Sequence, residues 1–207
     1  SRFSHAVWYD SYTAGSFSAS RVTNRMVAGD FNGDGKDDVA VMYEYNQSTM
    51  RILVFPANGS GTGFGSSSWY ISDTPGSYDA ARVIGRVVAG DFNGDGKDDI
   101  AAMYQYNSVT MAIHTFFANS NGNGFNGATW YESMQLGSFD VSRVTSRMVA
   151  GDRNGDGTDE IGAVYDNGAS QIRIFSWDRN GSENNFKLNT DLWNSYAVKV
   201  ADPTGSA

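Results

Sequence analysis

The chain has 207 residues, a formal net charge of −8 and no cysteine. The acidic balance argues against nucleic acid as a partner, because phosphates need a basic surface. No apolar run approaches the roughly 20 residues of a membrane span, so we expect no membrane insertion. A secreted chain without disulfides needs another staple, and a metal ion is the usual substitute.

Three copies of one repeat make up most of the chain. Asp30, Asp91 and Asp152 follow one another at intervals of 61 residues, and the tryptophans, arginines and tyrosines around them keep the same register. A fourth copy begins and then stops, so we expect a single, incomplete domain over the whole chain. The copies cover about residues 8–68, 69–129 and 130–190, and a partial repeat and tail follow at 191–207.

Each copy is expected to contain four antiparallel β-strands. Runs rich in β-branched and aromatic residues are separated by Gly, Asn and Ser clusters, which are strand and turn signals. No stretch shows a helical period of about 3.6 residues, so the predicted fold class is all-β. In the first copy the expected strands cover residues 25–28, 39–45, 50–55 and 64–71. A four-stranded unit repeated at this length is typical of a β-propeller blade.

Three blades are too few for a closed ring, which typically needs at least about four. We therefore expect either a homodimer that completes one six-bladed or seven-bladed ring, or a chain that is part of a longer propeller. The partial fourth repeat, which opens at Asp191-Leu192-Trp193, can supply an outer strand to a neighbour's blade.

An acidic loop follows the first expected strand of every copy. Oxygen-bearing side chains occupy positions 1, 3 and 5, and glycine at position 6 permits a sharp turn that lets position 7 offer its carbonyl. An acid at position 9 closes the shell. The residues are Asp30, Asn32, Asp34, Lys36 and Asp38 in the first copy, Asp91, Asn93, Asp95, Lys97 and Asp99 in the second, and Asp152, Asn154, Asp156, Thr158 and Glu160 in the third.

This pattern predicts one calcium ion (Ca2+) per repeat. Calcium is a hard cation that takes about six to eight oxygens, whereas magnesium prefers a smaller shell and zinc would want His or Cys. We expect the metal to have a structural role, tying strand to strand. The third loop has Glu160 in place of Asp and Arg153 in place of Phe, and we expect it to bind calcium more weakly.

The segment Val-Ala-Gly-Asp-Phe-Asn-Gly-Asp-Gly-Lys-Asp-Asp-Val at residues 27–39 resembles the FG-GAP, or VCBS-type, repeat. That repeat occurs in integrin α-subunit propellers and in secreted bacterial and fungal proteins, and the resemblance covers about residues 3–190. It implies four-stranded blades with calcium between the first two strands, and an extracellular location. Where the family has Gly-Ala-Pro, this chain has Met42-Tyr43-Glu44, which favours the secreted propellers, some of which are lectins, over an integrin-like adhesion role.

Aromatic and arginine residues repeated in every copy are the candidate ligand contacts. One member of each Trp-Tyr pair faces away from the core, and an exposed ring suits a sugar, although the rings can equally pack between blades. The arginines can donate to sugar hydroxyls or pair with nearby acids such as Asp79 and Asp140. The candidates are Trp8, Trp69, Trp130, Tyr9, Tyr70, Tyr131, Arg21, Arg82, Arg143, Arg25, Arg86 and Arg147.

The predicted function is that of a secreted, calcium-stabilised and multivalent carbohydrate-binding module. We expect no enzyme, because a Gly-x-Ser-x-Gly elbow and a cysteine nucleophile are missing and the patterned acids are assigned to calcium. A protein-adhesion or scaffold module is the first alternative. An accessory module of a polysaccharide-acting enzyme, or such an enzyme itself, is the second.

Overall fold

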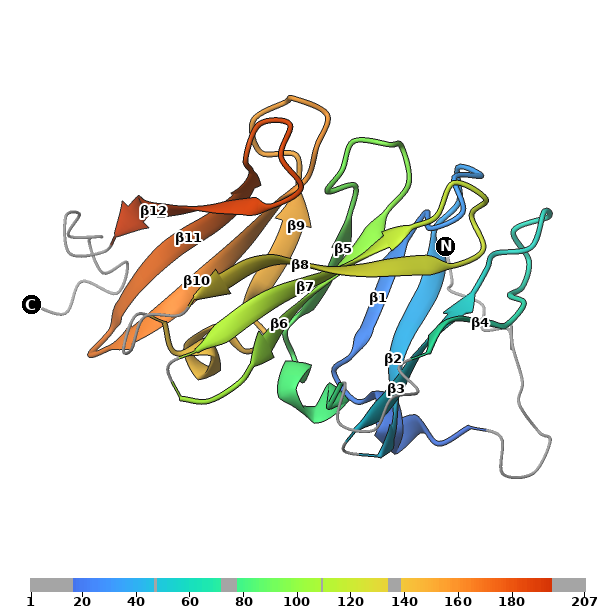
Figure 1. Cartoon of the computed structure of the whole chain (residues 1–207), viewed down its shortest axis with the longest axis horizontal. Helices are drawn as coiled ribbons and strands as arrows, with labels where there is room; N and C mark the ends of the chain where they lie inside the picture. The colour runs from blue at the N-terminus through green and yellow to red at the C-terminus, as the bar shows by residue number, and fades with distance from the viewer. Residues whose placement is uncertain (1–16, 47, 72–77, 109, 134–138, 195–207) are drawn as a thin grey trace, which may run out of the picture.

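The computed structural model describes residues 17–46, 48–71, 78–108, 110–133 and 139–194. Within these ranges the chain forms three antiparallel sheets of four strands, each in sequential order, and three short 3-10 helices (Figure 1). No helix in these ranges is long and apolar enough to cross a membrane. The three sheets of four antiparallel strands confirm the predicted all-β class and the four-stranded blades. The sheets are blades of a propeller-like fold that is not closed into a ring.

Each sheet is a meander in which a short first strand leads through the acidic loop into a longer second strand. The first sheet contains β1 (Met26–Gly29), β2 (Asp38–Asn46), β3 (Thr49–Phe55) and β4 (Ser67–Ile71); the second contains β5 (Val87–Gly90), β6 (Asp99–Gln105), β7 (Met111–Ala118) and β8 (Phe125–Ser133); the third contains β9 (Met148–Gly151), β10 (Glu160–Gly168), β11 (Gln171–Arg179) and β12 (Phe186–Asn194). The helices η1 (Ala19–Val22), η2 (Ala80–Val83) and η3 (Val141–Val144) precede the three sheets.

The strands lie within a few residues of their predicted positions. In β3 buried and partly exposed residues alternate along the strand, as expected when the two faces of a sheet differ. The largest difference is at β4, which begins three residues later than predicted. Phe64 makes only an isolated bridge with Ala57. Gly65 N donates to Pro56 O at 2.9 Å, but proline has no N–H to return the hydrogen bond, so the ladder is interrupted before β4.

The sheets are offset from the predicted copies of the repeat. Trp69 lies in β4 and Trp130 in β8, so the predicted boundaries after residues 68 and 129 divide the outer strands. A repeat of fixed period can be divided at any point, whereas a sheet is bounded by its strands. The segment predicted to open a fourth copy, at residues 191–193, lies in β12, where it completes the third sheet.

A β-bulge interrupts the outer strand pair of every sheet at an equivalent place. The register shifts between Ile52 and Leu53 in the first sheet, between Ile113 and His114 in the second, and between Ile174 and Ser176 in the third. A bulge bends its strand and increases the local twist, so the outer strands turn away from the plane of the inner ones.

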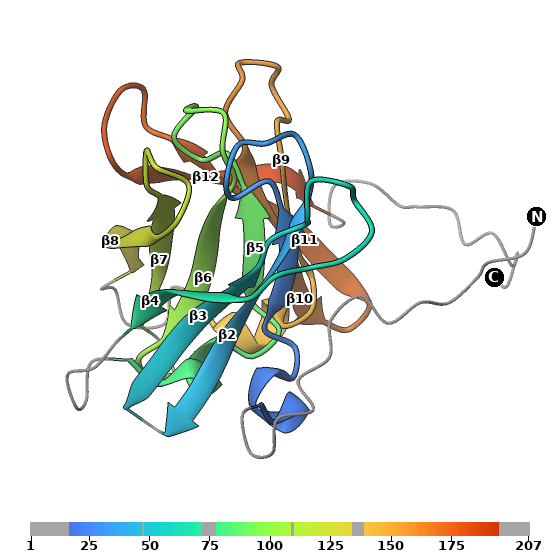
Figure 2. The same cartoon turned by 90° about the vertical axis from the view of Figure 1, so that its right-hand side faces the viewer.

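Two hydrophobic cores lie between neighbouring sheets, which stand one behind another in Figure 2. Phe31, at loop position 2 of the first sheet, is fully buried against Phe125 of the second sheet, with ring centroids 5.7 Å apart. Phe92 packs in the same way against Phe186 of the third sheet, also at 5.7 Å. The apolar faces of the first and second blades are therefore each completed by the next blade.

Candidate functional site

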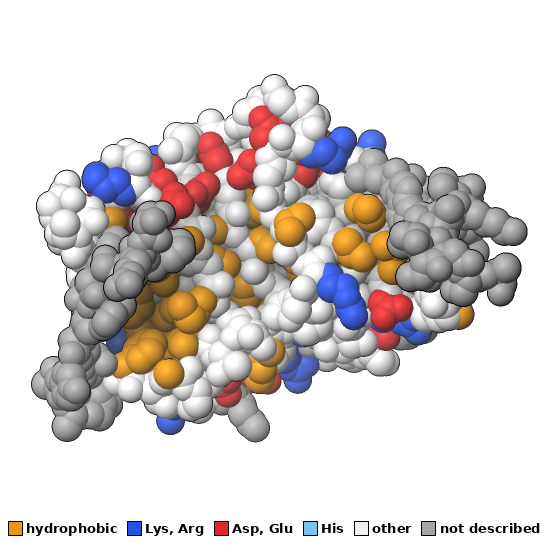
Figure 3. Space-filling view, turned by 180° about the vertical axis from the view of Figure 1, so that it is seen from behind, with side chains coloured by type: hydrophobic (Ala, Val, Ile, Leu, Met, Phe, Trp, Pro, Cys, Tyr) orange, Lys and Arg blue, Asp and Glu red, His pale blue; other side chains and the backbone are white. Residues whose placement is uncertain are grey.

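The acidic loops are held in shape by their first aspartate. The carboxylate of Asp30 accepts hydrogen bonds from the backbone N–H groups of Gly33, Asp34 and Gly35 at 2.7–3.0 Å. The turn needs glycine at two places, because Gly33 and Gly35 have positive φ angles of 76° and 82°. Asp91 and Asp152 make the same contacts in their own loops. Acidic side chains gather along the edge that carries the loops (Figure 3).

The acid at position 9 is buried beneath the loop. One oxygen of Asp38 accepts from the backbone N–H of Ala57 at 2.8 Å, and one oxygen of Asp99 accepts from that of Ala118 at 2.9 Å. These carboxyls therefore connect the loop to the region at the end of the third strand. Burial, reinforced by the negative charges of the neighbouring loop aspartates, raises the pKa of Asp38 to about 6 and that of Asp99 to about 8.

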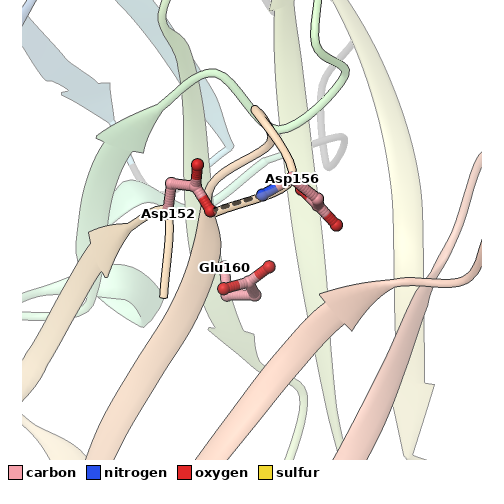
Figure 4. Close-up of side chains that lie close together, drawn as sticks. All are labelled: Asp152, Asp156 and Glu160. Atoms are coloured by element: carbon pink, nitrogen blue, oxygen red, sulfur yellow. Dashed lines mark hydrogen bonds between the residues drawn. The ribbon is translucent and has the colours of Figure 1, made fainter. Parts of the chain in front are cut away.

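The third loop brings three carboxylates together, as Figure 4 shows. One oxygen from each of Asp152, Asp156 and Glu160 lies within 4.8 Å of the others. The loop is held by a hydrogen bond from Asp156 N to Asp152 Oδ1 at 3.2 Å. Arg153, which replaces the phenylalanine of the other loops, places its Nε 3.8 Å from Glu160 Oε2. A positive charge therefore already stands beside the acid at position 9 of this loop.

The donor set of these loops fits a calcium ion. It consists of carboxylate and amide oxygens, the ligands that a hard cation prefers. In the second loop the amide oxygen of Asn93 is buried and has no hydrogen-bond partner within the part of the chain that the structure describes. A buried acceptor without a partner costs free energy, and a cation among these oxygens would satisfy it. The same cation would also offset the charge of the buried carboxylate of Asp99.

The repeated arginines bind main-chain carbonyl groups. Arg25 and Arg86 are buried, and the Nε of Arg86 donates to the carbonyl oxygen of Met103 at 3.3 Å. Arg82 donates to the carbonyl groups at the end of β6 and forms an ion pair with Asp79. Of the two roles considered for the arginines, this is the pairing with nearby acids. Arg21 and Arg143 make corresponding carbonyl contacts, and Arg147 is partly exposed. These contacts occupy the guanidinium groups within the fold.

The repeated aromatic pairs divide between the cores and the surface. Trp69 and Trp130 are buried in the cores between sheets, whereas Tyr70 and Tyr131 are only partly buried. Trp8 and Tyr9 lie outside the described residues. Tyr70 lines a surface cleft between the first and second sheets. Among the described tyrosines of these pairs, it is the one placed to contact a ligand there.

This cleft, which we call the tyrosine cleft, has a volume of about 430 Å³. The described residues of its lining are aromatic, polar or small, and their side chains carry no formal charge at neutral pH. The lining residues are Tyr70 from β4, Tyr78 before η2, Tyr106 after β6, His114 and Phe116 from β7, and Gly127, Ala128 and Thr129 from β8. A Cβ at Gly127 would lie 3.4 Å from the hydroxyl of Tyr70, so glycine leaves room for that hydroxyl.

Tyr78 and His114 give the tyrosine cleft its polar groups. Tyr78 is buried, with its ring 4.9 Å from that of Tyr104, and its hydroxyl has no hydrogen-bond partner among the described residues. The Nε2 of His114 lies 3.2 Å from the hydroxyl of Tyr106. Burial lowers the pKa of His114 to about 4, so its imidazole is neutral at pH 7.

Sequence reasoning did not single out Tyr78, Tyr106 or His114, although a signal for them exists. Each departs from the repeat in at least one other copy. Phe17 and Phe139 stand where the second copy has Tyr78, Leu53 and Phe175 stand where it has His114, and Tyr45 and Asn167 stand where it has Tyr106. Positions that break an otherwise regular repeat therefore mark the tyrosine cleft.

The three open sheets define a β-propeller-like module, and a comparison with known families agrees with this. Residues 30–102 match the FG-GAP-like repeat. This segment runs from the first acidic loop through the second and into β6, so the chain contains an FG-GAP-type repeat, as the sequence predicted. No curated protein matches the chain.

Proposed function

We propose that the protein is a calcium-stabilised propeller module that binds neutral carbohydrate in the tyrosine cleft. The observation that carries this proposal is at Tyr78, which lines the cleft and whose buried hydroxyl has no hydrogen-bond partner among the described residues. A buried hydroxyl without a partner is costly. A ligand hydroxyl in the cleft would satisfy it.

The surroundings of this hydroxyl favour a sugar over other ligands. The rings of Tyr70 and Phe116 lie 5.0 Å apart in the lining, and aromatic surface suits the C–H face of a sugar ring. The hydroxyl of Tyr106 and the neutral His114 supply further polar partners. Because the described residues of the lining include no lysine, arginine or acid, the expected ligand is uncharged.

The repeat itself supports a single specialised cleft. In the third sheet Phe139 and Phe175 replace Tyr78 and His114, and both phenylalanines are buried in the core between the second and third sheets. The equivalent place there is filled with apolar side chains. We therefore propose one sugar site per chain, in the tyrosine cleft. Multivalency would come from the association of several chains.

In this proposal calcium has a structural role, and one ion binds in each acidic loop. The buried carboxyls of Asp38 and Asp99 would share a cation with the oxygens at positions 1, 3 and 5 of their loops. Calcium sites of extracellular modules work at roughly 0.1–1 mM calcium. Dependence on calcium at this concentration favours a secreted protein.

The test is a glycan array with the purified chain in calcium, followed by titration of the sugars that bind. Replacing Tyr78 by phenylalanine removes one hydroxyl and reproduces the residue of the other two copies, so the fold is retained. We expect Tyr78→Phe to weaken binding about three- to tenfold, the effect of one neutral hydrogen bond.

Tyr45→Phe is the matched control, because Tyr45 lies in the first sheet, outside the cleft lining. It should bind like the unaltered protein. Binding to no glycan even when the chain is displayed at high density would refute carbohydrate binding. Equal affinities of Tyr78→Phe and the unaltered chain would refute the tyrosine cleft as the site.

A further inference from the structure

The two junctions between sheets use the same pair of hydrogen bonds, one between main-chain groups and one from a main-chain N–H to a carboxylate. At the first junction Asp98 N donates to Asp30 O at 3.0 Å, and Asp30 N donates to a carboxylate oxygen of Asp98 at 2.8 Å. At the second junction Asp159 N donates to Asp91 O at 2.9 Å, and Asp91 N donates to Asp159 Oδ2 at 3.0 Å. The acid at loop position 8 therefore joins each blade to the preceding one.

A glycine beside each contact lets the two chains approach. A Cβ at Gly29 would lie 2.5 Å from the carboxylate oxygen of Asp98, and a Cβ at Gly90 would lie 2.5 Å from that of Asp159. Either contact is too short for real atoms. At the equivalent Gly151 of the third sheet, a Cβ would have nothing within 4 Å. The third sheet thus has the glycine but no described acid against it.

A second set of junction contacts also repeats. Ser146 N donates to Gly85 O at 2.7 Å, as Gly85 N donates to Asn24 O at 2.8 Å. The buried Arg86 reaches across its junction to the hydroxyl of Thr145 at 2.8 Å. Arg147, the equivalent of Arg86 in the third sheet, has a side chain that is 45% exposed. The third sheet therefore presents the arginine donor of this set without a described contact across a junction, and its Ser146 carbonyl oxygen holds the place of the acceptor, as Gly85 O does at the second junction.

The first sheet presents the opposite half of the junction. Asp37 is equivalent to Asp98 and Asp159, and it is exposed. The two ends of the array therefore carry complementary halves of one contact. The first sheet carries the exposed acid, Asp37. The third sheet carries the glycine and the residue with the N–H group, Gly151 and the exposed Asp152.

The apolar faces at the two ends complement each other too. In the third sheet Ile174 is partly exposed and Val149 is 67% exposed, whereas Ile113, the equivalent of Ile174, is fully buried. In the first sheet Phe55 is partly exposed, whereas its equivalent Phe116 is buried. Apolar side chains are visible toward both ends of the array in Figure 3. A surface hollow of about 390 Å³ marks the open face of the third sheet.

We propose that a second copy of this chain docks head to tail on these ends, so that two chains close one ring. The first sheet of each copy would pack on the third sheet of the other. The carboxylate of Asp37 would then accept from the N–H of Asp152 over Gly151, continuing the junction already present twice within the chain. Propeller rings contain about four to eight blades. Two copies of the three described sheets supply six blades, a number within this range.

This dimer does not depend on sugar binding, and its test is the molar mass in solution. Light scattering or sedimentation of the full chain in calcium should give twice 22.4 kDa. Asp37→Ala and Gly151→Ala should each raise the dimer Kd roughly tenfold or more, the effect of losing a hydrogen bond to a charged acceptor or of a clash at that contact. Both should leave the circular-dichroism spectrum unchanged, because neither residue has a junction partner among the described residues.

Gly29→Ala is the matched control, because its Cβ would clash inside the chain. It should destabilise the fold itself, whatever the state of association. A monomer at every accessible concentration would overturn the proposal, as would assemblies that continue beyond two copies. A dimer whose Kd is unchanged by both Asp37→Ala and Gly151→Ala would place the interface elsewhere and would also overturn it.

Discussion

His114 is a residue whose environment is set by a departure from the repeat. Leu53 and Phe175 occupy its position in the other copies, and its ring lies 5.4 Å from that of Tyr78 and 5.1 Å from that of Tyr104. A polar imidazole therefore stands among aromatic rings. Its burial disfavours the protonated form, which is why its pKa falls to about 4.

This lowered pKa predicts an acid sensitivity that belongs to one residue. The unfolded chain binds the proton at an ordinary pKa of about 6.5, so between pH 6.5 and 4 it binds more protons than the folded chain. The stabilisation is complete above pH 6.5 and is lost as the pH falls toward 4. His114→Leu should therefore lose less unfolding free energy than the unaltered protein between pH 7 and 4, by roughly 1–3 kcal/mol.

Urea unfolding in calcium at the two pH values measures this difference. The facing hydroxyls of Tyr78 and Tyr106 have pKa values raised by burial and stay neutral throughout the range. Other groups that titrate are common to both proteins. Equal losses in the two proteins would show that His114 is not buried as a neutral group.

Single residues of the site were only partly predictable. The loop acids at positions 1, 5 and 9 were predictable because one loop contains all of them, at a fixed spacing. The tyrosine cleft was not, because Tyr70, Tyr78, Tyr106 and His114 come from separate segments, and only the packing of the second sheet against the first brings them together. A sequence pattern within one strand cannot show such convergence.

The first and second acidic loops each act on more than the two strands that they connect. The loop of the first sheet joins β1 to β2, and Asp38 reaches the backbone of Ala57, just beyond β3. Asp99 makes the corresponding contact in the second sheet. A cation in the loop would therefore order three strands of a blade together.

Removing calcium should lower the melting temperature substantially. A ligand that binds only the folded protein at about 100 times its Kd adds about 2.7 kcal/mol, which in a chain of this size corresponds to roughly 5–10 °C per occupied site. Calorimetry in calcium and in excess chelator measures the shift. Asp99→Asn should reduce it, whereas Asp79→Asn, outside the loops, should not. An unchanged melt in chelator would contradict calcium binding.

The elements themselves were well predicted, and the misplaced one has a physical cause. Strand alternation and turn residues fixed the strands of the first sheet to within a few residues. The start of β4 was misplaced because Phe64 looks like a strand residue, yet its pairing stops at a single bridge. Local composition indicated a strand there, but Pro56 on the opposite side has no N–H to continue the ladder.

At the scale of the whole molecule, buried arginines hold the blades together. Arg86 donates to the carbonyl groups of Arg82 and Met103 and reaches Thr145 across the junction. Burial lowers its pKa, although arginine remains charged. The period of the repeat predicted the number of blades and the open array. The period could not predict this junction, because Arg86 and Thr145 are 59 residues apart and only the packing of neighbouring sheets brings them together.

Arg86→Met should therefore destabilise the protein by roughly 2–4 kcal/mol, because it leaves buried carbonyl groups without partners. Arg143→Met should cost less than about 1 kcal/mol, because exposed ion pairs contribute little and the side chain of Arg143 is 42% exposed. Urea unfolding of the two variants under the same conditions makes the comparison. Similar losses would show that Arg86 does not hold the junction.

The bulge in every outer strand pair bears on how the molecule behaves in a crowded solution. The strands β4, β8 and β12 are the outer edges of their sheets. A flat edge offers unpaired N–H and C=O groups on which a foreign strand can add, the first step of fibril growth. The bulges at Leu53, His114 and Ser176 twist these edges. A chain with three apolar sheets is thereby guarded against edge-to-edge aggregation at each of them.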